Sequence, residues 1–280
     1  MTLNDTNLKG KLKVKVPGYF SFNKNREKFK GGVATVVANH LKHNIMKTAE
    51  GKEEDEYIIT RIDKTIPPIN LVNIYGSQES RSNKDDIENS WLRLMKDIDE
   101  AEDRNEAVII IGDMNRAIGN GEYGVKGNNN KISVGGQLIR NMIQERQYFL
   151  VNNLDIVQGG PWTWVDRKDC RRKSVLDLCI ISDALLPYVT NVEVDTEHRF
   201  TPRRITQTKK GIKTTFTDHY SLKIELKGIP KKEEHETNYT TWNVNKPGGW
   251  LRYEAATDLE AEKIKVIVIE EHNIDKVVKK

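Results

Sequence analysis

Several polar residues of this sequence stand at the ends of apolar runs, where their side chains could do hydrolytic chemistry. Asp113 and Asn115 follow the apolar run 108–111 and a glycine. A carboxylate and an amide at such a place suit a hard metal ion, a phosphate oxygen or an attacking water. The other polar residues next to or within apolar runs are Tyr75, Asp177, Asp218 and His219.

Of these residues, Asp177 has the greatest need of a polar partner, because it interrupts the apolar run 175–181. A buried aspartate costs several kcal/mol unless it is paired. Its natural partner is a histidine, whose tautomer and charge it would control, and His219 is the histidine that precedes a predicted strand. Pairing with Arg171 or Arg172 is the alternative.

Each of these residues alone also has an ordinary structural explanation. Asp113 and Asn115 are common turn formers, Tyr75 could be a core or interface tyrosine, and His219 could be structural. The whole set, with each member at the end of a hydrophobic run, is hard to explain by packing. We therefore interpret the set as one site.

Apolar periodicity predicts the elements that position these residues. Amphipathic spacing predicts a helix over 85–103 and a second helix around 138–143. Between them, 116–136 is a polar loop rich in glycine and asparagine, and 39–56 is expected to be a surface hairpin or loop. Runs of β-branched residues predict strands at 33–38, 57–62, 69–75, 108–111, 175–181, 189–194 and 222–226. Strands that alternate with helices along the chain in this way predict a layered α/β protein.

The composition is 37% hydrophobic and 31% charged, with a net charge of +4. The sequence has no stretch of about 18 apolar residues, so we expect no membrane span. Its two cysteines form no disulfide framework. We expect an intracellular protein, nuclear or cytoplasmic, without membrane contact. The net charge does not by itself indicate nucleic-acid binding. Basic residues gather locally, at 9–15, 24–30, 167–173 and 199–213.

Four motifs in the chain resemble, in order, those of the endonuclease/exonuclease/phosphatase family of metal-dependent phosphodiesterases. They are Asn73-Ile74-Tyr75-Gly76, Gly112-Asp113-Met114-Asn115, Leu176-Asp177-Leu178-Cys179-Ile180-Ile181-Ser182 and Thr217-Asp218-His219-Tyr220-Ser221. The segments 15–19, 31–34 and 242–250 resemble, more narrowly, the endonuclease domain of a non-long-terminal-repeat retrotransposon. The resemblance implies such a domain over 1–227, a linker at 228–240, and at 241–280 an extension like the segment before a reverse transcriptase.

The resemblance implies a four-layer α/β sandwich of two mixed β-sheets flanked by helices. It also implies hydrolysis of DNA phosphodiesters by an activated water. His219, oriented by Asp177, would contact the scissile phosphate, and Asp113 would position or deprotonate the water. Asn115 and Tyr75 would contact the same phosphate. Asp5 and Asp218 would bind Mg²⁺ or Mn²⁺, and the basic clusters would hold the DNA backbone.

The chain also departs from the family pattern. The family begins with a strand ending in asparagine, a helix, and a strand ending in a metal-binding glutamate. Here Asp5 aligns best with that glutamate, and the first βαβ portion is expected to be missing, which would remove a central strand and expose a sheet edge. Three alternatives stay open: an endonuclease, an inactive remnant that binds nucleic acid or protein, and a phosphatase for a small phosphoester or lipid. The sequence does not predict the oligomeric state. The tryptophans Trp162 and Trp164 either flank the site or pack in the core.

Overall fold

The computed structural model describes residues 1–25, 31–41, 43–48, 56–80, 82–126, 128, 130–200, 203–208 and 211–231. These residues belong to one compact unit, Met1–Glu233. Most of the expected linker at 228–240 and all of the expected extension at 241–280 lie outside the described residues.

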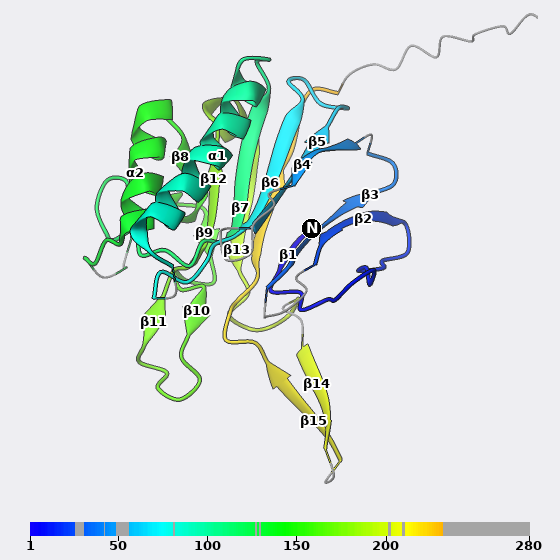
Figure 1. Ribbon diagram of the computed structural model, residues 1–280, viewed down its shortest axis with the longest axis vertical. Coiled ribbons are helices and arrows are strands. Elements are labelled where there is room, and N and C mark those ends of the chain that lie inside the picture. Colours follow the sequence, from blue (N-terminus) through cyan, green and yellow to red (C-terminus); the bar gives the residue numbers. More distant parts are fainter. Residues whose placement is uncertain are drawn as a thin grey trace, which may run out of the picture. The chain divides into compact units, whose positions relative to one another are not determined.

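A six-stranded mixed sheet runs through the middle of this unit (Figure 1). Its neighbouring strands β6 and β7 are parallel, and the other neighbours are antiparallel. Since parallel strands end at the same edge of a sheet, Tyr75 at the end of β6 lies beside Asp113 at the end of β7. In spatial order the strands are β4 (His43–Thr48), β5 (Glu56–Ile62), β6 (Ile69–Tyr75), β7 (Ala107–Asp113), β12 (Asp177–Ile181) and β8 (Phe149–Leu150).

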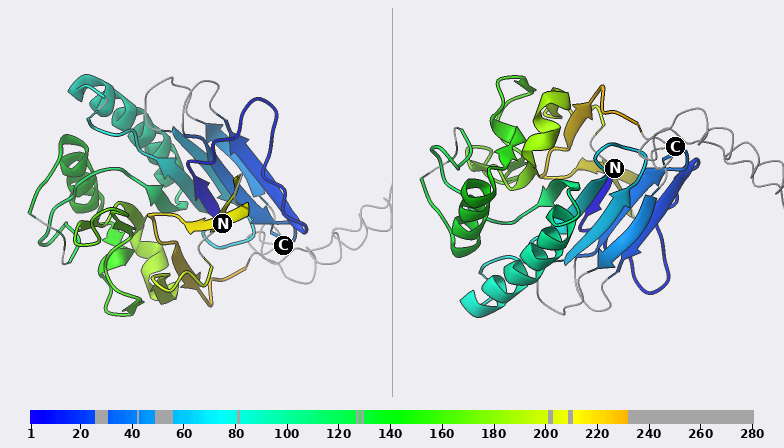
Figure 2. Two further views of the ribbon diagram at one scale, coloured as in Figure 1. Left: turned by 90° about the horizontal axis from the view of Figure 1, so that it is seen from below. Right: turned by 90° about the horizontal axis from the view of Figure 1, so that it is seen from above.

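Two helices, α1 (Lys84–Glu102) and α2 (Val134–Arg146), cover one face of the central sheet (Figures 1 and 2). The helix α1 begins where the Asn83 side chain accepts a hydrogen bond from the Asp86 amide, an ordinary N-cap. Its apolar stripe packs on the sheet in one cluster that includes Trp91, Leu94, Ile98, Val108 and Ile110. The crossover from β6 through α1 to β7 is what allows these two strands to be parallel.

Two three-stranded sheets make up the second layer. One has the order β1-β3-β2, with β1 (Thr2–Asn4), β2 (Tyr19–Lys24) and β3 (Val33–Ala38). The other has the order β16-β13-β9, with β9 (Val157–Gln158), β13 (Val189–Val194) and β16 (Leu222–Leu226). Apolar residues of the second sheet pack against the central sheet in a second core cluster that includes Ile69, Cys179, Ile181 and Val192. The predicted α/β sandwich is therefore confirmed.

Two hairpins project from the end of the unit where β6 and β7 finish (Figure 1). They are β10 (Trp164–Val165) with β11 (Lys173–Ser174), and β14 (Arg203–Thr208) with β15 (Gly211–Phe216). The remaining elements are the 3-10 helices η1 (Val151–Asn153) and η2 (Asp183–Tyr188). None of the described helices has the length and apolar character needed to cross a membrane.

The structure changes three local expectations. The segment expected as a surface hairpin or loop at 39–56 contains β4, which is an edge strand of the central sheet. The strand at 175–181 is not interrupted by Asp177 but starts at it. The loop at 116–136 is shorter than expected, since the Ser133 hydroxyl accepts a hydrogen bond from the Gly136 amide and α2 begins at Val134.

Candidate active site

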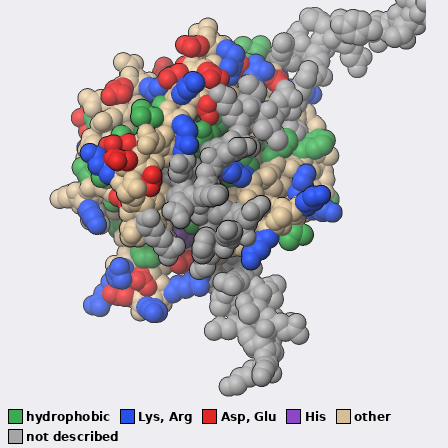
Figure 3. Space-filling model, viewed as in Figure 1, with side chains coloured by type: hydrophobic (Ala, Val, Ile, Leu, Met, Phe, Trp, Pro, Cys, Tyr) green, Lys and Arg blue, Asp and Glu red, His purple; other side chains and the backbone are tan. Residues whose placement is uncertain are grey.

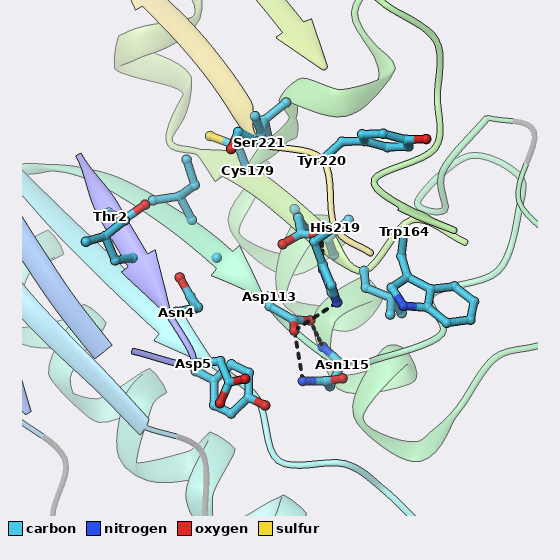
Figure 4. A pocket seen from close by; sticks show the side chains of 18 of the residues that line it. Thr2, Asn4, Asp5, Asp113, Asn115, Trp164, Cys179, His219, Tyr220 and Ser221 are labelled. Carbon is cyan, nitrogen blue, oxygen red and sulfur yellow. Dashed lines mark hydrogen bonds and ion pairs between the residues drawn. The ribbon is translucent and has the colours of Figure 1, made fainter. Parts of the chain in front are cut away.

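One cavity of about 1940 Å³ collects every site residue that the sequence predicts. It opens where the strands of the central sheet end, and the polar side chains around Asp113 point into it (Figure 4). The predicted residues that line it are Asp5, Tyr75, Asp113, Asn115, Asp177, Asp218 and His219.

Strand register brings three of these residues into one row. Tyr75 of β6 pairs with Asp113 of β7, and Asp113 pairs with Asp177 of β12. Residues directly opposite one another in a sheet point to the same face, so this row presents its side chains to the same cavity. Gly112 permits the close approach of β7 to β6: its φ is +147°, and a Cβ there would lie 1.9 Å from the Ile74 carbonyl oxygen.

Asn115 holds the carboxylate of Asp113. Its backbone has a φ of 48°, a left-handed conformation that asparagine tolerates. The Asn115 backbone amide donates to Asp113 Oδ1 at 3.0 Å, and its Nδ2 donates to Asp113 Oδ2 at 3.1 Å and to the Gly76 carbonyl at 2.9 Å. In this arrangement Asn115 orients Asp113, and its predicted contact with a phosphate stays a prediction.

The structure pairs Asp177 with His219 rather than with an arginine. His219 Nδ1 lies 2.8 Å from Asp177 Oδ2, and His219 Nε2 lies 3.9 Å from Asp113 Oδ2. The alternative partners Arg171 and Arg172 form ion pairs with other aspartates of the β10–β11 hairpin. The imidazole thus lies between two carboxylates.

Thr163 is a positioning residue that the sequence analysis missed. It is fully buried, and its hydroxyl accepts hydrogen bonds from the amides of Leu176 and Asp177, both at 3.0 Å. Its carbonyl accepts from the Tyr220 amide at 2.7 Å. Thr163 therefore ties the segment of Asp177 to the segment of His219. The position of this polar residue between Trp162 and Trp164 was the feature of the sequence that could have identified it.

Arg116 was missed as well, although it directly follows Asn115. It is 3% exposed, it forms an ion pair with Glu79, and it donates to the backbone carbonyl of Ser77. Glu79 also accepts from the Gly135 amide at 2.9 Å, in the first turn of α2. This network holds the chain that leaves β6 after Tyr75.

Burial and charge shift the proton affinity of two site residues. Burial raises the pKa of Asp113, and the charge of Asp177 raises it further, to about 7. Burial alone would lower the pKa of His219, but the charge of Asp177, the hydrogen bond to Asp177 and the charge of Asp113 raise it to about 9. Near neutral pH the imidazole is therefore protonated, and Asp113 is poised to exchange a proton.

The two carboxylates beside His219 offer oxygen ligands to a divalent cation, whereas the protonated imidazole offers none. One ligand atom each of Asp113, Asp177 and His219 lies within 4.8 Å of the others. Burial is the main cause of the raised pKa of Asp113, and the nearby charge of Asp177 adds to it; a cation would offset that charge. The predicted ligands Asp5 and Asp218 line the same cavity outside this group. Asp5 is exposed with a φ of 50°, and Asp218 forms an ion pair with Arg167 at 3.3 Å.

The two predicted tryptophans, Trp162 and Trp164, lie in different surroundings. Trp164 lines the cavity, and its backbone forms a bridge with His219; its ring lies beside the imidazole in Figure 4. Trp162 instead packs against the core cluster under the helices. Of the two tryptophans, Trp164 alone lines the cavity.

The sequence of this chain matches no protein-family model and no curated protein. Solved structures do match its fold. A 3′ phosphatase from Neisseria bound to a product DNA hairpin is 18% identical, with 80% of this chain and 87% of that chain covered and a TM-score of 0.54. An AP endonuclease from Archaeoglobus fulgidus is 15% identical, with 81% and 88% covered and a TM-score of 0.51.

A further structure carries the family's name. An endonuclease/exonuclease/phosphatase family protein from Bacteroides thetaiotaomicron is 13% identical, with 75% of this chain and 74% of that chain covered and a TM-score of 0.50. The chain has the fold of these proteins, as its four motifs predict.

Proposed function

We propose that this chain, with its endonuclease/exonuclease/phosphatase fold, is a metal-dependent hydrolase that nicks DNA and descends from a retroelement endonuclease. The observation that carries the proposal is the cluster of Asp113, Asp177 and His219 at the strand ends of that fold. Two of its structural neighbours, a 3′ phosphatase bound to a product DNA hairpin and an AP endonuclease, support the proposal.

Each residue of the cluster has its own role in hydrolysis. Asp113 accepts a proton from a water, whose oxygen forms a new bond to phosphorus while the bond from phosphorus to the leaving oxygen breaks. The leaving oxygen takes up a proton from solvent. His219 stays protonated beside Asp177 and donates to a phosphate oxygen, on which negative charge develops. Tyr75, at the same strand edge, lies where its hydroxyl can reach that phosphate.

A divalent cation, Mg²⁺ or Mn²⁺, supplies positive charge to the phosphate oxygens when it is bound. Hard cations of this kind prefer oxygen ligands. The oxygens proposed to hold it are the carboxylates of Asp5 and Asp218, which line the same cavity as Asp113 and Asp177.

The β10–β11 hairpin offers a surface for the DNA backbone. Its loop carries Arg167, Arg171 and Arg172, with side chains 51%, 93% and 70% exposed, and Arg167 also lines the cavity. Figure 3 shows Lys and Arg side chains, with acidic ones among them, over this hairpin. Contacts of this kind position a duplex without reading its sequence.

Nicking of supercoiled plasmid in Mg²⁺ or Mn²⁺ tests the proposal. We expect His219→Ala and Asp113→Ala each to reduce the nicking rate by about 10²-fold or more, as removal of a general base or a charge-stabilising donor does. Matched controls are His40→Ala and Asp155→Ala, since both residues are exposed and lie outside the cavity lining. Nicking that persists in both site variants would refute the proposal.

One observation favours a second candidate, a remnant that binds nucleic acid without hydrolysing it. Asp5 aligns with the family's metal-binding glutamate, yet it is exposed and lies outside the group of close ligand atoms. A shorter side chain on a left-handed backbone places its carboxylate less favourably. Salt-sensitive DNA binding without nicking in either metal would support this candidate.

A further inference from the structure

The segment that connects β1 to β2 forms a basic arm beside β2. We define the arm as residues 9–16. Two asparagine side chains hold its backbone: Asn23 Oδ1 accepts from the Val14 amide at 3.0 Å, and Asn25 Nδ2 donates to the carbonyls of Gly10 and Leu12 at 2.8 and 2.7 Å. Because these bonds reach only the backbone of the arm, they fix its course and leave its side chains available.

The arm lies on the face of the β1-β3-β2 sheet that points away from the central sheet. Asn4 of β1 reaches the Ile74 carbonyl of the central sheet, so its side chain points inward. Asn4 and Lys24 both pair with Val33 and therefore share that inner face. Neighbouring residues of a strand point to opposite faces, so Asn23, with the arm bound to it, lies on the outer face.

The outward surface of the arm is positively charged. The arm contains four lysines and no acidic residue. Its lysines are exposed, whereas Val14 and Val16, which alternate with Lys13 and Lys15, are half-buried. None of the four lysines forms an ion pair with a residue that the structure describes. Lysines two positions apart on an extended backbone are about 7 Å apart, so they form a row of charge that can follow a phosphate backbone.

The arm also encloses a recess. It has a volume of about 190 Å³ and is lined by the arm residues 10–13 together with Asn23 and Asn25. Two of its lining residues, Lys11 and Lys13, carry positive charge. The charge of the arm therefore surrounds a hollow rather than covering a flat surface.

Exposed aromatic side chains lie next to this charge. A turn closed by a hydrogen bond from the Tyr19 amide to the Val16 carbonyl, at 3.1 Å, leads from the arm into β2. Tyr19 and Phe20, the first residues of β2, are 47% and 54% exposed. Lysines beside exposed aromatic rings are the combination with which proteins bind single-stranded nucleic acid, since the lysines bind phosphates and the rings stack on bases. In a duplex the bases already stack on one another inside the helix.

This surface is separate from the candidate active site. In the sheet order β1-β3-β2, β1 contributes to the cavity lining, and no residue of the arm does. Figure 1 shows the arm in dark blue beside β2, on the opposite side of the unit from the β10–β11 hairpin. On that side of the same view, Figure 3 shows Lys and Arg side chains next to hydrophobic ones. A duplex held at the cavity by β10–β11 therefore leaves the arm accessible.

We propose that the arm, together with Tyr19 and Phe20, is a second nucleic-acid site that binds single-stranded DNA. The lysines bind successive phosphates, and the two rings stack on bases. The choice of DNA as the strand rests on the proposed function, whereas the single-strand preference rests on the exposed rings. The site would let the chain hold an unpaired strand while a duplex occupies the cavity.

An anionic membrane has the same charge as DNA but fits this surface less well. Membrane-surface binding requires a continuous apolar face. The apolar residues Val14 and Val16 of the arm are half-buried, and its outward face is mainly lysine. The test nevertheless includes vesicles.

The test measures fluorescence anisotropy of the whole chain with a thymidine oligomer of about 15 nucleotides and with a duplex of the same length, in the presence of a chelator. The combined variant Lys11→Gln, Lys13→Gln and Lys15→Gln should bind the oligomer about tenfold or more weakly. It should also reduce the slope of log K against log salt by about 2, since three phosphate contacts are lost. The matched control, Lys84→Gln, Lys96→Gln and Lys126→Gln, removes the same charge from exposed positions elsewhere.

Two results of this comparison would overturn the proposal. One is unaltered affinity of the arm variant for the oligomer. The other is an equal loss of affinity for the duplex, which would make the arm a general contact for DNA. Binding is measured without metal, so the result does not depend on whether the chain hydrolyses DNA.

The aromatic contact has its own test. We expect Tyr19→Ala to weaken binding of the oligomer by about tenfold and Tyr19→Phe to keep it, because phenylalanine retains the ring. Equal affinities of these two variants would contradict stacking. Photo-crosslinking of an oligomer that carries 5-iodouracil should label Tyr19 or Phe20, and labelling confined to Trp164 in the cavity would overturn the proposal.

Two further ligands test the identity of the partner. Tenfold tighter binding of a uridine oligomer of the ribose series would overturn the assignment to DNA. Sedimentation with phosphatidylserine vesicles tests the membrane. Vesicle binding that the arm variant abolishes, with oligomer binding unchanged, would assign the surface to lipid and overturn the proposal.

Discussion

Two ionisable side chains of the site differ in how burial and charge act on them. Asp113 is almost fully buried beside a second carboxylate, which raises its pKa to about 7. His219 lies between Asp177 and Asp113, and their charges overcome the effect of burial and raise its pKa to about 9. Opposite protonation preferences of neighbouring groups distinguish a proton acceptor from a group that stays protonated and donates a hydrogen bond. In the proposed reaction these are Asp113 and His219.

The substitution Asp177→Asn tests this assignment at one residue. It removes the charge that raises the pKa of His219 most, so we expect that pKa to fall from about 9 towards its ordinary value of 6.5. An NMR titration of the His219 ring protons measures it. A pKa that stays near 9 in the variant would show that other groups hold the proton.

The pairing of His219 with Asp177 also makes the free energy of unfolding depend on pH, and the raised pKa of His219 gives the direction. Because the pKa of His219 is raised in the folded state, its contribution to the free energy of unfolding is fully present below about pH 6.5. That contribution is lost as the pH rises from there through about 9. Denaturant unfolding at pH 6 and at pH 10 should therefore show a larger stability difference for the unaltered chain than for His219→Gln. An equal difference for the two proteins would contradict the assigned shift.

At the scale of elements, Thr163 connects two segments that the chain brings together from a distance. Replacing it by valine leaves the amides of Leu176 and Asp177 without their acceptor. We expect Thr163→Val to lower the free energy of unfolding by about 1–3 kcal/mol, the cost of unsatisfied buried donors. Thr163→Ser keeps the hydroxyl and should lose less. Urea denaturation of the three proteins gives the comparison, and equal losses for valine and serine would rule out the hydrogen bonds as the cause.

Apolar periodicity predicted the strands β3, β5, β6, β13 and β16 and the helix α1, because each carries a strong local pattern. The hairpin β14–β15 has mainly polar and basic residues, so no apolar pattern marked it. The joint lining of one cavity by Tyr75, Asp113 and Asp177 follows from strand register, which depends on contacts far apart in the sequence. For the same reason the sequence named Asp177 and His219 as partners but did not reveal Thr163, whose role exists only in the folded chain.

At the scale of the whole molecule, the net charge of +4 is small, and the local distribution of charge matters more. If the hairpin β10–β11 holds DNA, replacing Arg167, Arg171 and Arg172 by glutamine should weaken binding and reduce the slope of log K against log salt by about 2–3. The control replaces Arg93 and Lys96, which are exposed on α1. Fluorescence anisotropy over a series of salt concentrations measures both slopes. An unchanged slope would place the DNA elsewhere.

The central claim is that an activated water attacks a DNA phosphate at the site of Asp113 and His219. The most direct measurement is cleavage of a duplex oligonucleotide in ¹⁸O-labelled water with Mg²⁺ or Mn²⁺, followed by mass spectrometry of the products. We predict one ¹⁸O atom in the one terminal phosphate that each cleavage creates, none in the fragment that ends in the leaving hydroxyl, and no labelled product from Asp113→Asn. Absence of labelled product from the unaltered chain, or equal labelling with Asp113→Asn, would contradict the account.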